Sequence, residues 1–198
     1  MTKFKIFMLN SSLAIFSFLS MNCDSGGPTS SKEIRESLNA IKLTEIHYHP
    51  LDSGDTNNDD LFEFVELKNA SNSSVDMSDV GFTDGIDFTF PAGTKIVPQG
   101  FFVIASDNDH FKSRYGFDAN GVYKGKLSNN GETITLTDLK NGGEILSVAY
   151  SDTIPWPVEA DGVGNSLVPV TMSTIGNQKS ADQWRSSTDK NGSPGKDD

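Results

Sequence analysis

The chain has 198 residues, which is enough for one domain of ordinary size with additional tails. Its residues are 35% hydrophobic and 22% charged, a composition that excludes both a wholly disordered chain and a protein with many membrane spans. The 27 acids and 16 bases give a net charge of -11, which disfavours nucleic acid as a partner, and the single cysteine excludes a disulfide framework.

Residues 1–22 are predicted to be a signal peptide. Lys3 and Lys5 precede an apolar stretch, 6–21, which is shorter than the roughly 20 residues of a membrane-spanning helix. The letters LSMNC (19–23) resemble a bacterial lipobox, which implies that Cys23 becomes a lipid-modified N-terminus and that the protein is anchored at the cell envelope, on its periplasmic or outer surface. The alternative is an ordinary exported protein with a free thiol.

Residues 23–39 are predicted to be a flexible tether. The segment 24–31 contains glycine, proline and serine and no apolar residue, a composition that favours a mobile spacer. Ser31 and the segment 33–38 are sufficient for one helical turn. We therefore expect the folded domain to begin near Ala40.

Beyond Ala40, short strands alternate with turns. The first strand, 41–50, changes its apolar alternation, which a β-bulge near Glu45 would explain. An Asn-Gly pair at 130–131 is typical of a hairpin turn, so 122–127 is expected to begin a meander with the last two strands. Five further segments have the pattern of strands: 61–69, 85–90, 101–106, 132–138 and 144–150.

One short helix is predicted, with Asp109 as its N-cap and Gly116 at its end. Roughly seven or eight strands with short connections predict an all-β fold, an antiparallel β-sandwich. The residues expected in its core are Phe88, Val103, Ile134, Leu136 and Val148.

Several pieces of the sequence occur in an order that resembles a known family. They are LTEIHYHP (43–50), FEFVELKNASNSSVDMSDVGFTD (62–84), FTFPAGTKIVPQGFFVIA (88–105), LSNNGETITLTD (127–138) and ILSVAYSD (145–152), followed by Trp156, DGVGNSL (161–167), Trp184 and SPG (193–195). Together they resemble the lamin-tail domain, as found in exported bacterial proteins. The resemblance implies an immunoglobulin-like sandwich without shared catalytic residues. We expect residues 40–170 to form the sandwich and 171–198 to form a tail packed partly on it.

Two pairs of side chains are candidate sites. His47 and His49 share a strand face at i,i+2 spacing, so they are a candidate metal pair, although two solvent-facing polar residues are the simpler interpretation. Trp156 stands between two prolines and is expected to cover a sheet edge, while Trp184 is expected to pack the tail onto the sandwich. Stacking on a carbohydrate ligand is the alternative role for both indoles.

An acidic loop is a third candidate site. Asp55, Asn57 and Asp59 have the one-three-five spacing of a calcium loop, and Glu66 falls at position twelve. Hard oxygen ligands at alternate positions suit Ca²⁺, so these four residues are predicted to bind calcium weakly. The alternative is a solvated acidic loop whose residues favour turns. No other cofactor is expected.

The motifs of common catalytic sites are absent from the sequence, and we do not expect an enzyme. The leading hypothesis is a lipid-anchored, extracytoplasmic binding or structural module that presents the loops of a sandwich to a protein or glycan partner. One alternative is a secreted hydrolase with a site near His47, His49 and the acidic loop. The other is nucleic-acid binding by analogy with lamins, which the net charge opposes.

Overall fold

Strands dominate the computed structural model, which describes residues 31–51, 54, 58–171 and 178–198. The strands are β1 (Ile41–His47), β2 (Phe64–Asn69), β3 (Val75–Asp76), β4 (Val80–Asp84), β5 (Lys95–Ile96), β6 (Phe101–Ala105), β7 (Gly121–Val122), β8 (Glu132–Asp138), β9 (Gly143–Tyr150), β10 (Leu167–Pro169) and β11 (Trp184–Ser186). The helices are α1 (Ser31–Leu38) and α2 (Asn108–Tyr115), with 3₁₀ turns η1 (Asp59–Phe62), η2 (Val158–Ala160) and η4 (Ala181–Gln183).

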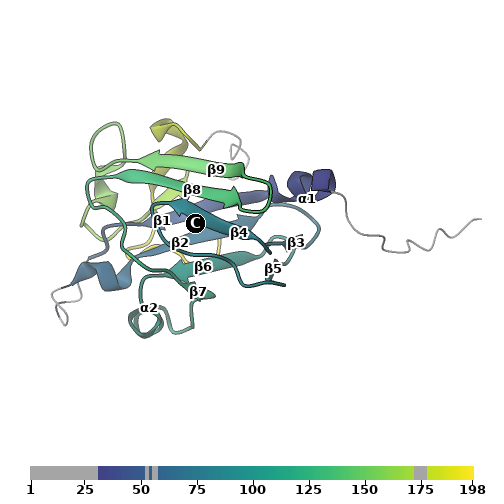
Figure 1. Ribbon diagram of the computed structural model, residues 1–198. Helices are drawn as coiled ribbons and strands as arrows, with labels where there is room; N and C mark the ends of the chain where they lie inside the picture. Colours follow the sequence, from purple (N-terminus) through teal and green to yellow (C-terminus); the bar gives the residue numbers. More distant parts are fainter. Residues whose placement is uncertain (1–30, 52–53, 55–57, 172–177) are drawn as a thin grey trace, which may run out of the picture.

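The strands pack as two layers (Figure 1). The larger sheet has the order β11-β10-β1-β2-β6-β7, the smaller has the order β4-β8-β9, and β3 pairs with β5. Among the described strands, every pairing is antiparallel except that of β6 with β7. Buried side chains from both sheets form one large core. The expected antiparallel β-sandwich is therefore confirmed.

The first strand carries the bulge that its sequence predicts. The pairing of β1 with β2 shifts register between Leu43 and Glu45. Because the extra residue inverts the alternation, Leu43 and Ile46 both point into the core, where both are fully buried. Glu45 and His47 consequently lie on the opposite, outer face of the sheet.

The hydrophobic side chains form a large core and a smaller cluster under α2. Ile134, Leu136 and Val148 are fully buried in the large core, as expected. Val103 is buried too, but in the smaller cluster, and Phe88 is only partly buried at the rim of the large core. The buried residues of the smaller cluster are Phe64, Val103, Ala105 and Phe111.

Helix α2 begins earlier than the sequence predicts. Its N-cap is Asp107, whose carboxylate accepts a hydrogen bond from the backbone N–H of His110 (2.9 Å), and Asp109 lies in the first turn instead. An acidic residue is favourable at either position because a helix N-terminus is electropositive, so the pattern alone does not separate the two. Gly116 ends the helix with a φ of 80°, as predicted.

The predicted strand over 122–127 is wrong in extent and direction. The structure contains only the two-residue β7, which runs parallel to β6. Tyr123 and Leu127 instead serve the buried carboxyl of Glu63: the Tyr123 hydroxyl and the Leu127 backbone N–H both donate to Glu63 Oε2, at 2.7 and 2.9 Å. A buried carboxyl oxygen needs hydrogen-bond donors, and these two residues supply them instead of extending a strand. Of the predicted meander, only the hairpin of β8 and β9 is formed.

Part of the predicted tether is folded. Residues 31–38 form α1, and Leu38 at its end is 2% exposed and belongs to the large core. Burial of this leucine holds the end of the helix against the sandwich. Residues 23–30 of the predicted tether, and the signal peptide 1–22, lie outside the described residues.

The C-terminal residues complete the fold, which corrects the boundary expected at 170. β11 pairs with β10 and covers its free edge. The side-chain amide of Gln178 accepts a hydrogen bond from the N–H of Leu43 (3.2 Å) and donates to the carbonyl of the same residue. The Trp184 indole N–H donates to the Gln178 carbonyl (2.9 Å). Residues 178–198 are therefore an integral part of the sandwich rather than a tail packed partly on it.

Leu136→Ala is expected to lower the free energy of unfolding by about 2–5 kcal/mol, because the leucine is fully buried between the sheets. Leu139→Ala is the matched control: Leu139 is 44% exposed, and its loss should cost less than about 0.5 kcal/mol. Chemical denaturation measures both values. Equal losses in the two variants would contradict the position assigned to Leu136.

Candidate functional site

Two connections meet at one end of the sandwich, on the left in Figure 1. We call this region the loop end and define it by residues 48–51, 58–60 and 151–166. His49 joins its two parts: Nδ1 lies 2.6 Å from Asp161 Oδ1, and Nε2 lies 3.2 Å from Asp59 Oδ2. The Gly162 N–H also donates to the His49 carbonyl (3.1 Å). The imidazole therefore fixes the two connections relative to each other.

A glycine is required beside this imidazole. Gly162 has a φ of 68°, and a Cβ at this position would lie 2.9 Å from His49 Cε1. Any other side chain would be strained in its backbone and would also press on the ring. The close approach of backbone to imidazole is thus part of how the loop end is built.

The loop end exposes apolar side chains beside carboxylates. Asp152, Glu159 and Asp161 lie in the same connection as most of these apolar residues, and Asp59 pairs with His49 in the other connection. Large exposed apolar side chains gathered at one end of a domain are candidates for contact with another protein. The exposed apolar residues and their exposed fractions are Ile154 (84%), Leu51 (51%), Val163 (51%) and Val158 (48%).

Two of the cations near the loop end bind backbone oxygens. Arg114 Nη2 donates to the Leu51 carbonyl (2.9 Å), and Lys190 Nζ donates to the Val163 carbonyl (2.7 Å). These contacts hold the backbone of the two apolar positions in place. They also tie α2 and the C-terminal residues to the loop end.

His47 does not join His49 in a shared site, contrary to the predicted metal pair and to the predicted hydrolase site. It is fully buried on the outer face of β1, where its ring packs edge-on against Phe64 at a centroid distance of 5.4 Å. Burial, with the nearby Arg114 charge, lowers the pKa of His47 to about 3, so the imidazole is neutral. A hydrolase site built on both histidines is not assembled among the described residues.

Trp156 and Trp184 pack on each other inside the protein. Their exposed fractions are 8% and 4%, and their ring centroids are 6.3 Å apart. Trp184 thus holds the C-terminal residues on the sandwich, as predicted. The alternative role, stacking on a carbohydrate, needs an open ring face, and both rings are enclosed in the folded protein.

Two carboxyl groups are buried on the outer face of the larger sheet. Glu45 of β1 and Glu66 of β2 are paired across the strands, and each is 1% exposed. Glu45 accepts hydrogen bonds from the Ser166 hydroxyl and from the Ser193 N–H (2.9 Å). Glu66 accepts from the Thr44 hydroxyl (2.6 Å). Residues distant in sequence therefore converge on this pair.

Burial changes the ionisation of both groups. It raises the pKa of Glu45 to about 8, against the opposing effect of the Ser166 hydrogen bond, and it raises the pKa of Glu66 to about 7, against that of Thr44. Both values exceed the ordinary 4.5, so the folded state binds more protons than the unfolded chain above that pH. The stability that this protonation contributes is fully present below pH 4.5 and is lost as the pH rises through about 7 and 8.

The calcium prediction is corrected at Glu66, whose carboxyl is enclosed in this pair rather than turned toward the acidic loop. Asp59 is described and faces His49, whereas Asp55 and Asn57 lie outside the described residues. In the part of the chain that the structure describes, no group of three or more His, Cys, Asp or Glu side chains is arranged to hold a metal ion. Calcium binding by the rest of the loop stays a prediction.

The membrane anchor also stays a prediction, because Cys23 lies outside the described residues. Within the described ranges, no helix is long and apolar enough to cross a membrane.

Sequence reasoning missed the distant partners of these groups. Asp161, which binds His49, begins the segment DGVGNSL (161–167), and Ser193 belongs to SPG (193–195). Both segments stand out in the sequence only through the family resemblance. No spacing rule connects residues separated by 112 or 148 positions, so the contacts become visible only in the folded chain.

The fold defines the class of the protein: an immunoglobulin-like β-sandwich whose loops gather at one end. A family model, the Lamin Tail Domain, matches residues 35–152. The match covers more than half of the chain, and the protein belongs to the lamin tail domain family. A comparison with curated proteins found no match. The family is a non-enzymatic immunoglobulin-like domain, which fits a binding or structural module.

Trp184→Ala is expected to lower the free energy of unfolding by about 3–5 kcal/mol, because it removes a buried indole that packs on Trp156. Trp184→Phe keeps most of the packing but loses the N–H donor to Gln178, so it should cost clearly less. Chemical denaturation measures both variants. A ligand-binding indole would instead be dispensable for stability, and Trp184→Ala as stable as the wild type would contradict the packing role.

Proposed function

We propose that the protein is a non-catalytic binding module, held at the cell envelope by lipid on Cys23, whose loop end docks a protein partner. The observation that carries the proposal is the set of exposed apolar side chains at the loop end, led by Ile154 with 84% of its surface exposed. The family supports the general class, since its domain is a scaffold rather than an enzyme.

A protein partner suits the loop end better than a glycan does. The indoles that would supply a stacking platform for sugars are enclosed, whereas aliphatic side chains are exposed. Three acidic residues, Asp152, Glu159 and Asp161, lie in the same connection as Ile154 and Val163. We therefore propose a partner whose surface combines apolar residues with positive charge, because opposite potentials speed and orient association.

The same electrostatics oppose the alternative of nucleic-acid binding. The chain has a net charge of -11, and phosphate backbones are repelled by a surface of the same sign. The lamin analogy extends to the fold, while the charge of this chain points to partners of the opposite sign.

The loop-end proposal predicts a specific loss of partner capture. The protein is used as bait on detergent-solubilised envelope, and Ile154→Asn with Glu159→Lys should reduce capture of the bound partner at least tenfold, because both apolar contact and charge attraction are removed. Capture by the wild type should also fall with added salt.

Val97→Asn is the matched control. Val97 is 60% exposed beside β5, which lies away from the loop end in Figure 1, so its loss should leave capture unchanged. Retention of the partner by the loop-end variant, or its loss from the Val97 variant, would refute the proposed docking surface.

The anchor is tested separately with Cys23→Ala. Removal of the only thiol should leave unprocessed precursor or release the protein into the soluble exported fraction, because acyl chains would provide the membrane affinity. Partitioning into detergent and intact mass measure the outcome, with Ser20→Ala as a control beside the same cysteine. Unchanged partitioning of Cys23→Ala would exclude lipid at this residue.

A further inference from the structure

The C-terminal residues 187–198, which we call the C-terminal strap, lie across the outer face of β1 and β2. Two backbone N–H groups of the strap bind the buried carboxyl pair: Ser193 donates to Glu45 Oε1 (2.9 Å), and Gly195 donates to Glu66 Oε2 (2.5 Å). Gly192 has a φ of 78°, and a Cβ there would overlap Glu45 Oε1. Its lack of a side chain lets the strap backbone descend onto the carboxyl.

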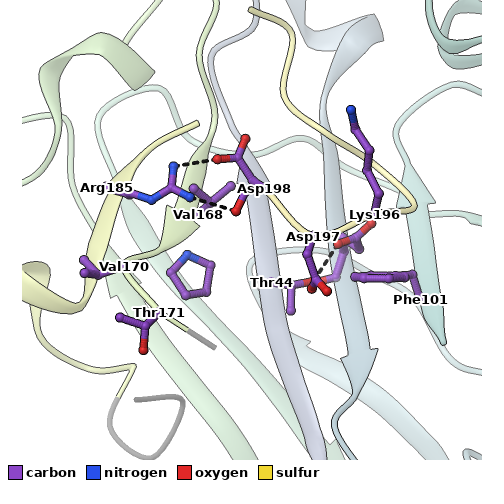
Figure 2. A pocket seen from close by; sticks show the side chains of 11 residues that line it. Thr44, Phe101, Val168, Val170, Thr171, Arg185, Lys196, Asp197 and Asp198 are labelled. Carbon is purple, nitrogen blue, oxygen red and sulfur yellow. Dashed lines mark hydrogen bonds and ion pairs between the residues drawn. The ribbon is translucent and has the colours of Figure 1, made fainter. Parts of the chain in front are cut away.

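Ion pairs fasten the far end of the strap. Lys68 of β2 pairs with Asp197 (2.5 Å), and Arg185 of β11 pairs with Asp198 (2.5 Å), as Figure 2 shows for Arg185. A cavity of about 50 Å³ remains between the strap and the sheet, lined by Thr44, Glu66 and Arg185 among others. The cavity under the strap therefore extends to the Glu66 side chain.

The cations around the pair compensate the ionised carboxyls only in part: the Lys68 charge lowers the pKa of Glu66, but burial outweighs it. Lys68, Arg185 and Lys196 pair with aspartates of the strap, and Lys190 binds the Val163 carbonyl. Among the described residues, no cation forms an ion pair with Glu45 or Glu66. The titratable and charged groups that face the pair are His47 of β1, Lys68 of β2, Arg114 and Tyr115 of α2, Arg185 of β11, and Asp189, Lys196, Asp197 and Asp198 of the strap.

We propose that the C-terminal strap is a pH-sensitive latch, closed while Glu45 and Glu66 are protonated and released when they ionise. Ionisation places two negative charges opposite each other in a site almost without solvent, next to the aspartates of the strap. Lifting the strap returns both carboxylates to water, where their charge is tolerated. The two N–H donors reduce this driving force but do not cancel it, since burial dominates at both groups.

The direction of the effect follows from linkage. Both pKa values are raised in the closed state and return toward 4.5 when the strap lifts, so protons favour the closed strap. The opening equilibrium therefore rises with pH and does so most steeply below about 7 to 8. The strap also binds the loop end, because Lys190 Nζ donates to the Val163 carbonyl and the Asn191 N–H donates to the Gly164 carbonyl. Its release would expose the outer face of β1 and β2, which is a different surface from the proposed docking surface.

Limited proteolysis of the full chain with trypsin tests the latch. Cleavage after Lys190 reports on the strap, whereas cleavage after Lys68, which is 6% exposed within β2, reports on global unfolding. A synthetic peptide of residues 186–198 corrects for the pH dependence of the protease. Between pH 6 and 9 the corrected rate after Lys190 should rise at least tenfold. Each carboxyl that ionises on opening multiplies the opening equilibrium by about ten for each pH unit, as long as the pH is below its closed-state pKa.

The variant Glu45→Gln with Glu66→Gln should flatten this pH profile, and Asp189→Asn, which removes a strap charge but keeps the carboxyl pair, should retain it. Hydrogen exchange at the Ser193 and Gly195 amides of the wild type supplies a second measure that needs no variant. A corrected rate after Lys190 that does not change with pH, or that rises only in step with cleavage after Lys68, would refute the latch.

Discussion

The register slip between Leu43 and Glu45 is the constraint on which the rest of the structure depends. Without it, strict alternation along β1 would place either Leu43 or Ile46 on the outer face and leave the core incomplete. With the register slip, Leu43 and Ile46 both enter the core. As a consequence, Glu45 and His47 lie on the outer face of the sheet. Polar groups buried there need partners, because each unpaired group loses its hydration without compensation.

Those partners come from late in the sequence. Ser166, Ser193 and Gly195 provide hydroxyl and N–H donors to Glu45 and Glu66, and Gln178 satisfies both backbone groups of Leu43 beside the bulge. A sandwich that ended near residue 170 would leave these groups open to solvent. The C-terminal residues thus supply hydrogen bonds to polar groups that the bulge buries on the outer face of β1. This need explains why they form a strand and a strap instead of a loose tail.

Much of the fold was predictable because its signals are local. Alternation identified β8 and β9, Gly116 marked the end of α2, and the changed alternation of β1 revealed the bulge. Errors arose where a long-range contact decided the outcome: Tyr123 and Leu127 leave strand geometry to bind Glu63. The candidate sites were less predictable for the same reason, since Asp161 meets His49 and the strap meets β1 across more than a hundred residues.

The candidate sites lie only partly within the region of the family match. The matched region, 35–152, supplies the scaffold of two sheets, whereas Asp161, Ile154 and Val163 of the loop end and all of the strap follow it. These later residues contact the chain at two places in or next to β1: Asp161 binds His49, just beyond the end of the strand, and Ser193 binds Glu45 at the bulge. The segments that follow the matched region therefore complete both features: they carry most of the exposed apolar side chains of the loop end, and the strap covers the buried carboxyl pair of Glu45 and Glu66.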